Sequence, residues 1–210
     1  MHAPRYGRTE QAANALSHGL GAVMGVAGLV VLVVAASAAG GGLRVASASV
    51  YGATLVALYL ASTLYHAVPS GGAAEVFRVV DHAAIFLLIA GSYTPFCLVA
   101  LRGALGWVLL AVVWTLALGG VVITAVALTR TRVAAMVLYV GMGWCIVIAA
   151  GPVVRVLDPV TLSLLVAGGI LYTGGLGFYG RGFRFAHTVW HLFVMVASGL
   201  HWWAVYRVVG

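Results

Sequence analysis

Charged residues are scarce in this sequence, and their scarcity excludes most classes of protein. Only 7% of the 210 residues are charged, whereas 63% are hydrophobic. A soluble domain carries about 25% charged residues and roughly 45–50% apolar ones. The composition therefore excludes a soluble globular domain, a disordered chain and a collagen-like repeat. It leaves a polytopic membrane protein as the class that fits.

Lysine is absent and cysteine is rare, and each shortage removes a kind of chemistry. Without a lysine amine the protein cannot be a retinal Schiff-base pump. Cys97 and Cys145 lie in apolar runs and form no CxxC pair, so we expect them to be small apolar fillers. The eleven basic residues, all arginine, separate apolar segments singly or in pairs. This distribution is typical of loop charges that orient membrane helices, and nucleic-acid binding is not expected.

Long apolar runs are abundant, and each is long enough to cross a membrane. A span needs about 20 apolar residues, and continuous runs of this length favour helices over barrel strands. We therefore expect an all-α, seven-transmembrane helix bundle that forms a single integral membrane domain over residues 1–210. The predicted helices are 15–38, 46–66, 79–101, 105–128, 133–154, 159–179 and 186–208. Short connectors make successive helices antiparallel neighbours, and Gly21 and Gly25 have the spacing of a close helix contact.

The distribution of arginine predicts the orientation of this bundle, because cytoplasmic loops carry an excess of positive charge. With the N-terminus inside, the inner segments hold Arg5, Arg8, Arg78, Arg130, Arg132, Arg181 and Arg184. The outer segments hold Arg44, Arg102, Arg155 and Arg207. The bias predicts a cytoplasmic N-terminus and an external C-terminus, in a multi-pass protein of the cell inner (plasma) membrane.

Ionisable side chains gather at one predicted depth, although they come from distant parts of the sequence. His66 ends the second helix with Ser62 one turn earlier, Asp81 begins the third, and His187 and His191 begin the seventh. Two imidazoles four residues apart on a helix can bind one metal ion from the same side. Three histidines with an open fourth position form a standard catalytic zinc arrangement. Asp81 could hold a water or orient an imidazole, and Ser62 could add a hydrogen bond.

Other polar residues admit more than one interpretation. Glu10 and His18 lie at the inner end of the first helix, and His18 could belong to an ordinary solvated helix start. His82 points about 100° away from its neighbour Asp81, which favours packing or an outer-shell role. His201 lies about 15 Å further along the last helix than the histidine cluster and stands apart from it.

The cluster residues themselves also have simpler explanations. An isolated HxxxH pattern is weak support for a metal site, and His66 could be a residue of the membrane interface. Asp81 could favour the positive end of its helix or pair with Arg78. The coincidence of costly polar residues on three helices at one depth favours the metal interpretation.

The chain resembles the hemolysin III family, the bacterial branch of the progestin and adipoQ receptor superfamily. The resemblance is carried by residues 10–19, Ser62–His66, Asp81–Ile85, Ala90–Phe96, Gly168–Tyr172 and His187–Phe193. It implies seven helices, a cytoplasmic N-terminus and a zinc ion on the inner side, held by His66, His187 and His191 with Asp81 and Ser62 as an accessory pair. The relatives named for adiponectin reception and alkaline ceramidase activity suggest hydrolysis of lipid amides.

Three hypotheses follow, and the sequence leaves open whether the protein is an enzyme. The first is a zinc-dependent hydrolase of membrane lipid amides or esters, with Asp81 as general base or water holder and Ser62 stabilising the oxyanion. The second is a pore or cytolysin, but the apolar stretches Val108–Val113 and Val160–Ile170 argue against a monomeric water-filled pore. The third is a receptor-like or membrane-homeostasis protein with structural zinc. The oligomeric state is not predicted.

Overall fold

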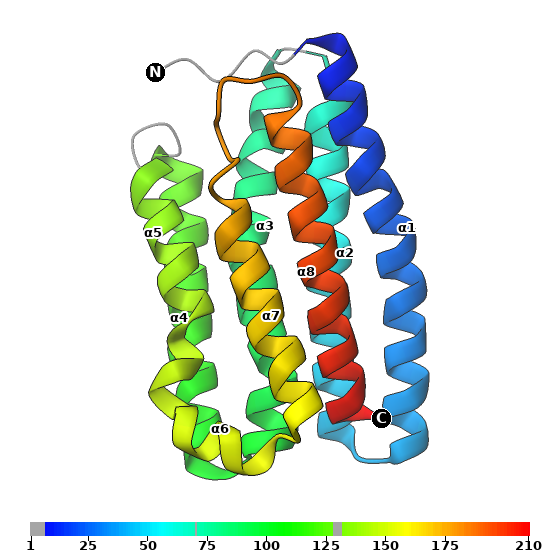
Figure 1. Ribbon diagram of the computed structural model, residues 1–210, viewed down its shortest axis with the longest axis vertical. Coiled ribbons are helices and arrows are strands. Elements are labelled where there is room, and N and C mark those ends of the chain that lie inside the picture. The colour runs from blue at the N-terminus through cyan, green and yellow to red at the C-terminus, as the bar shows by residue number, and fades with distance from the viewer. Residues whose placement is uncertain (1–6, 70, 128–131) are drawn as a thin grey trace.

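The computed structural model describes residues 7–69, 71–127 and 132–210. Within these residues the regular secondary structure is helical. The helices stand side by side along the long axis, with the start of α1 at one end and the C-terminus at the other (Figure 1). Six of the described helical segments are long and apolar enough to cross a membrane, and the shorter apolar helix Pro159–Gly175 brings the number to seven. The chain is a multi-pass membrane protein, as its composition predicts.

Each predicted span has a counterpart, and the fifth is divided into three pieces. In chain order the elements are α1 (Arg8–Ala39), α2 (Gly42–Ala67), α3 (Gly72–Pro95), the π-helix η1 (Phe96–Leu101), α4 (Gly103–Ala127), α5 (Arg132–Gly143), the 3-10 helix η2 (Cys145–Ala149), α6 (Ala150–Val156), α7 (Pro159–Gly175) and α8 (Ala186–Val209). Of the arginines used to predict orientation, Arg5 and Arg130 lie outside the described residues.

Helix ends differ from the prediction where polar residues extend a helix beyond its apolar part. α3 begins at Gly72 and not at residue 79. The additional turns include Glu75 and Arg78, which pair with each other at 2.6 Å on the helix. Asp81 consequently lies in the third turn of α3 and not in its first. The predicted alternative partner of Asp81, Arg78, is thus engaged elsewhere.

Three further helix ends also differ by four residues or more. α2 begins at Gly42 and not at residue 46. α1 begins at Arg8 and not at residue 15, and the Glu10 carboxylate accepts a hydrogen bond from the Gly7 backbone N–H at 3.1 Å, which satisfies a free donor of the first turn. α7 ends at Gly175 and not at residue 179, where residues 174–177 contain three glycines and the chain continues in turns.

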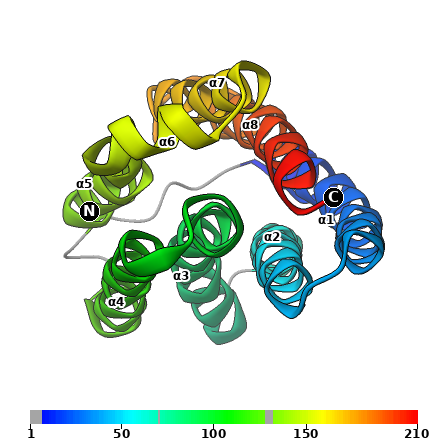
Figure 2. The ribbon, with the colours of Figure 1, turned by 90° about the horizontal axis from the view of Figure 1, so that it is seen from below.

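Small residues allow α1 and α2 to pack closely. A β-carbon on Gly21 would lie 2.7 Å from the ring of Tyr59, and one on Gly25 would lie 3.3 Å from Val56. The close contact predicted from the spacing of Gly21 and Gly25 is therefore confirmed. Seen from below, α5 to α8 form one arc and α2 to α4 form a second row, with α1 beside α2 and α8 (Figure 2). The first and last helices are thus neighbours.

Tyr93 of α3 satisfies the backbone where the fifth span is interrupted. Its hydroxyl donates toward the carbonyl oxygens of Met142 and Gly143, at 2.7 and 2.9 Å, and accepts a hydrogen bond from the Ile146 N–H at 2.8 Å. Backbone groups freed inside a membrane must find protein partners, because no bulk water is available to them. One side chain therefore stabilises the junction between α5 and η2.

Candidate metal centre

Three buried histidines converge at the end of the bundle where α1 begins. His66 lies in the last turn of α2, and His187 and His191 lie in the first two turns of α8. The ring centroids are 5.1 Å apart for His66 and His187, 5.0 Å for His66 and His191, and 4.7 Å for His187 and His191. One ring nitrogen from each lies within 4.8 Å of the other two. The antiparallel arrangement predicted for these helices brings the three imidazoles together.

The donor set fits a divalent transition metal such as zinc. Zinc commonly takes histidine nitrogens at about 2.0–2.1 Å, which for tetrahedral geometry places ligand nitrogens roughly 3.4 Å apart. The three imidazoles therefore need only small side-chain adjustments to share an ion. In the described ranges, this is the group of histidine, cysteine and acidic side chains that could hold a metal.

Helix α1 contacts the outer side of two of these rings. The Gln11 side-chain oxygen accepts a hydrogen bond from Nδ1 of His66 at 2.7 Å. Nδ1 of His191 donates to the backbone oxygen of Asn14 at 3.2 Å and lies 3.1 Å from the hydroxyl of Ser17. A proton held on Nδ1 leaves Nε2 with the lone pair that a metal requires. α1 thus favours the metal-binding tautomer of both histidines.

A second set of contacts ties the start of α1 to the start of α8. The Glu10 carboxylate accepts a hydrogen bond from the Phe185 N–H at 2.7 Å, where Phe185 has a left-handed backbone with φ of 63°. The Asn14 side-chain oxygen accepts a hydrogen bond from the Thr188 hydroxyl at 2.6 Å. These bonds set the position of α8, and hence of His187, relative to α1.

Sequence reasoning did not recognise Gln11, Asn14 and Ser17 as partners of the cluster. A signal was nevertheless present, because these residues follow at three-residue intervals and form a polar stripe on one side of an apolar helix. In a membrane span such a stripe indicates a functional contact or a polar neighbour.

Asp81 and Ser62 lie next to each other on the wall of a cavity that His187 and His191 also line. Both are buried, and the Ser62 side chain is within hydrogen-bonding reach of the Asp81 carboxyl. The five residues predicted to form a site are therefore close together in space. Their chemical roles stay predictions.

His82 is held outside the metal cluster by two hydrogen bonds. Its Nδ1 donates to the backbone oxygen of Arg78 at 2.8 Å, so Nε2 accepts from the Tyr179 hydroxyl, also at 2.8 Å. The Asp81 carboxylate lies 3.6 Å from Nδ1. This arrangement is consistent with the predicted packing or outer-shell role.

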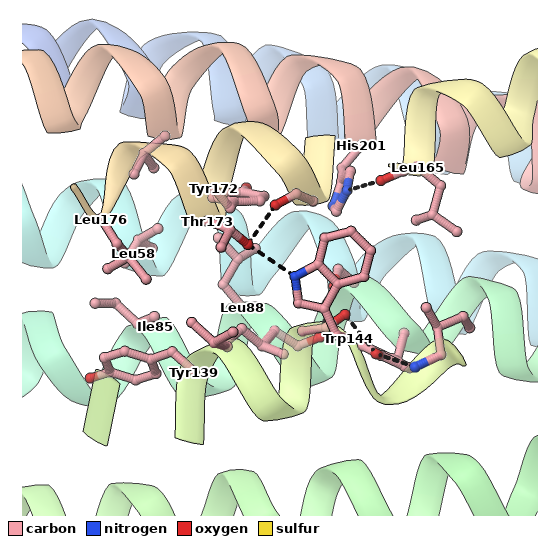
Figure 3. Close-up of a pocket in the computed structure, with 18 of the residues that line it drawn as sticks. Leu58, Ile85, Leu88, Tyr139, Trp144, Leu165, Tyr172, Thr173, Leu176 and His201 are labelled. Carbon is pink, nitrogen blue, oxygen red and sulfur yellow. Dashed lines mark hydrogen bonds between the residues drawn. The ribbon is translucent and has the colours of Figure 1, made fainter. Parts of the chain in front are cut away.

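The cavity has a volume of about 360 Å³ and runs along the bundle from the histidine cluster to His201. Its walls are largely apolar and include Leu58, Ile85, Leu88 and Leu176 (Figure 3). At the far end, Nε2 of His201 donates to the backbone oxygen of Leu165 at 3.0 Å (Figure 3). His201 is separate from the cluster, as its spacing predicts, but lines the same cavity.

Comparison with known proteins supports the resemblance seen in the sequence. A family model described as haemolysin-III related matches residues 6–202. Hemolysin-3 of Bacillus cereus is 43% identical over 197 residues, which cover 93% of this chain and 90% of that protein. The Hemolysin-3 homolog of Bacillus subtilis (strain 168) is 39% identical, with 93% and 92% covered. The monocyte to macrophage differentiation factor of Homo sapiens is 29% identical over 168 residues, with 77% and 69% covered.

Proposed function

Because the chain belongs to the haemolysin-III-related family, we propose that it is a zinc-dependent hydrolase of membrane lipid amides or esters. The observation that carries this proposal is the shared location of the three histidines, Asp81 and Ser62. Four of them line an apolar cavity, and His66 adjoins His187 and His191, so a lipid acyl group in the cavity would meet polar chemistry there.

His66, His187 and His191 would hold the metal through one nitrogen each, which leaves a coordination position open. Zinc in such a site supplies an activated water and polarises a carbonyl group. Three neutral imidazoles and one carboxylate beside a divalent ion leave a net charge of about +1, which favours an anionic transition state.

Asp81 is the candidate general base. It would take a proton from the attacking water as the water oxygen bonds to the acyl carbon, and would return a proton to the leaving nitrogen or oxygen as the acyl bond breaks. Ser62 lies beside it and would orient the carboxylate or donate to the developing oxyanion. The products are a fatty acid and an amine or alcohol.

The cavity suits the acyl chain of such a substrate. Its apolar side chains, among them Leu58 and Leu176, would surround the acyl chain in place of the neighbouring lipid tails of the bilayer. They would also keep water away from the reacting group. The distribution of arginine favours a cytosolic location for the reacting end of the cavity.

The decisive experiment compares metal content and hydrolysis in the same purified samples. Wild-type protein should carry about one zinc per chain, and His187→Ala should carry none. Wild type incubated with ceramides and phospholipids should release fatty acid. Asp81→Asn should bind zinc yet release at least about 100-fold less. Asp158→Asn, the same exchange at the opposite end of the bundle, is the matched control and should be fully active.

Two other functions correspond to distinct outcomes. Full zinc occupancy without fatty-acid release above background would favour a receptor-like protein with structural zinc. Leakage of dye from liposomes that is equal for wild type and His187→Ala would favour a pore or cytolysin. Zinc retention by His187→Ala would refute the ligand assignment itself.

A further inference from the structure

His18 lines the cavity and contacts the metal cluster, and the proposed hydrolysis gives it no role. It is only 3% exposed and stacks face to face on His191, with ring centroids 3.5 Å apart and planes 9° from parallel. The edge of Tyr59 meets its ring at 5.1 Å, at an angle of 79°. These two aromatic neighbours hold the imidazole in one orientation at the wall of the cavity.

Both ring nitrogens of His18 lack a well-formed hydrogen bond to any described residue, although the His191 backbone approaches the ring. Buried polar atoms are almost always hydrogen-bonded. His82 and His201, which line the same cavity, each bond a backbone carbonyl. His18 is therefore a cavity histidine with both ring nitrogens open to an incoming polar group.

A ligand role toward the metal does not account for His18. The nitrogens that gather within 4.8 Å belong to His66, His187 and His191, and His18 is not part of that group. Its ring lies flat on His191, so it supports one ligand and leaves its own nitrogens for another partner.

We propose that His18 hydrogen-bonds the polar group of the lipid in the cavity and selects a group that both donates and accepts. A neutral imidazole presents one N–H donor and one lone-pair acceptor. These two nitrogens face opposite sides of the ring, so one lipid group bonds one of them. A hydroxyl or a secondary amide can bond either nitrogen, as acceptor to the N–H or as donor to the bare nitrogen, whereas an ether or an ester can bond the N–H alone. The inference rests on the proposed function in one respect, namely that a lipid occupies this cavity.

The test uses two lipids that cannot be hydrolysed and differ in a single donor, oleyl alcohol and oleyl methyl ether. Their dissociation constants are measured with purified, zinc-assayed full-length protein. Wild type should bind the alcohol about tenfold more tightly than the ether, the effect of one hydrogen bond. His18→Phe keeps a stacking ring without nitrogens and should bind the two lipids equally. His18→Asn restores a donor and an acceptor and should recover part of the preference.

Equal binding of the two lipids by wild type overturns the proposal, and so does an undiminished preference in His18→Phe. If that variant does not fold, the nitrogen resonances of ¹⁵N-labelled histidine in wild type decide. The signal of the bare, accepting nitrogen of His18 should move with the alcohol and stay in place with the ether. A signal that moves equally with both lipids, or with neither, contradicts the proposal. Neither lipid is turned over, so these results are independent of fatty-acid release. A protein that prefers the alcohol but hydrolyses nothing would refute the hydrolase and keep the role of His18.

Discussion

Nδ1 of His66 lies 2.7 Å from the side-chain oxygen of Gln11, across the contact between α2 and α1. The two residues are 55 positions apart in the chain, and the bond orients an imidazole that faces two others. Since Asn14 makes a comparable bond to His191, one face of α1 sets the orientation of two of the three candidate ligands.

Replacing Gln11 by leucine should weaken zinc binding about 10–100-fold, the usual effect of removing an outer-shell partner of a ligating histidine. The dissociation constant is measured by competition with a chromogenic chelator. Gln11→Glu keeps an acceptor at the same place and should bind zinc at least as well as wild type. Equal affinities in the leucine and glutamate variants would show that the bond does not tune the site.

Replacing Tyr93 by phenylalanine should destabilise the protein by about 1–3 kcal/mol, because the backbone groups at the α5–η2 junction lose their partner. The loss is measured as a lower unfolding midpoint in detergent or lipid. Tyr206→Phe is the control, because Tyr206 makes stacking contacts with Trp202 and Trp203 that phenylalanine can keep. A Tyr93→Phe variant as stable as this control would mean that the junction finds other partners.

Replacing Gly168 by alanine should also destabilise the protein, by about 1–3 kcal/mol, because a β-carbon there would overlap the ring of His201. The matched control is Gly169→Ala, whose β-carbon would meet its nearest neighbour, Trp144, at 3.5 Å. The double variant Gly168→Ala, His201→Ala should lose less stability than the two single variants added together, because the clash disappears. Strict additivity in thermal unfolding would rule out this contact as the cause.

At the opposite end of the bundle, Asp158 should contribute stability that depends on pH. Hydrogen bonds from the Thr161 hydroxyl and backbone N–H, together with the Arg207 guanidinium, lower the pKa of Asp158 from 3.8 to about 2. Because the folded-state pKa is the lower one, this stabilisation is complete above about pH 4 and disappears as the pH falls toward 2. The melting temperatures of wild type and Asp158→Asn should thus differ at pH 6 and converge near pH 2. A constant difference would assign the effect to helix capping and not to charge.

Hydropathy was enough to predict membrane insertion and the number of spans, because the cost of placing a helix in a membrane is a sum over about 20 neighbouring residues. It placed the start of α3 less well, since Glu75 and Arg78 lower the local hydropathy without ending the helix. It also missed the end of α7, where glycines end the helix within an apolar stretch. The break at η2 left no signal of this kind, because the residues around it are as apolar as the rest of the span.

The meeting of His66 with His187 and His191 was also predictable, because four-residue spacing and antiparallel order are properties of the chain that hydropathy reveals. The contacts around these histidines were not. The stacking of His18 on His191, the bond from Gln11 to His66 and the satisfaction of the η2 break by Tyr93 depend on the rotation of each helix about its axis and on which helices become neighbours. These features arise when side chains pack between α1, α2 and α8 and between α3, α5 and η2. No window of local sequence contains both partners of such a contact.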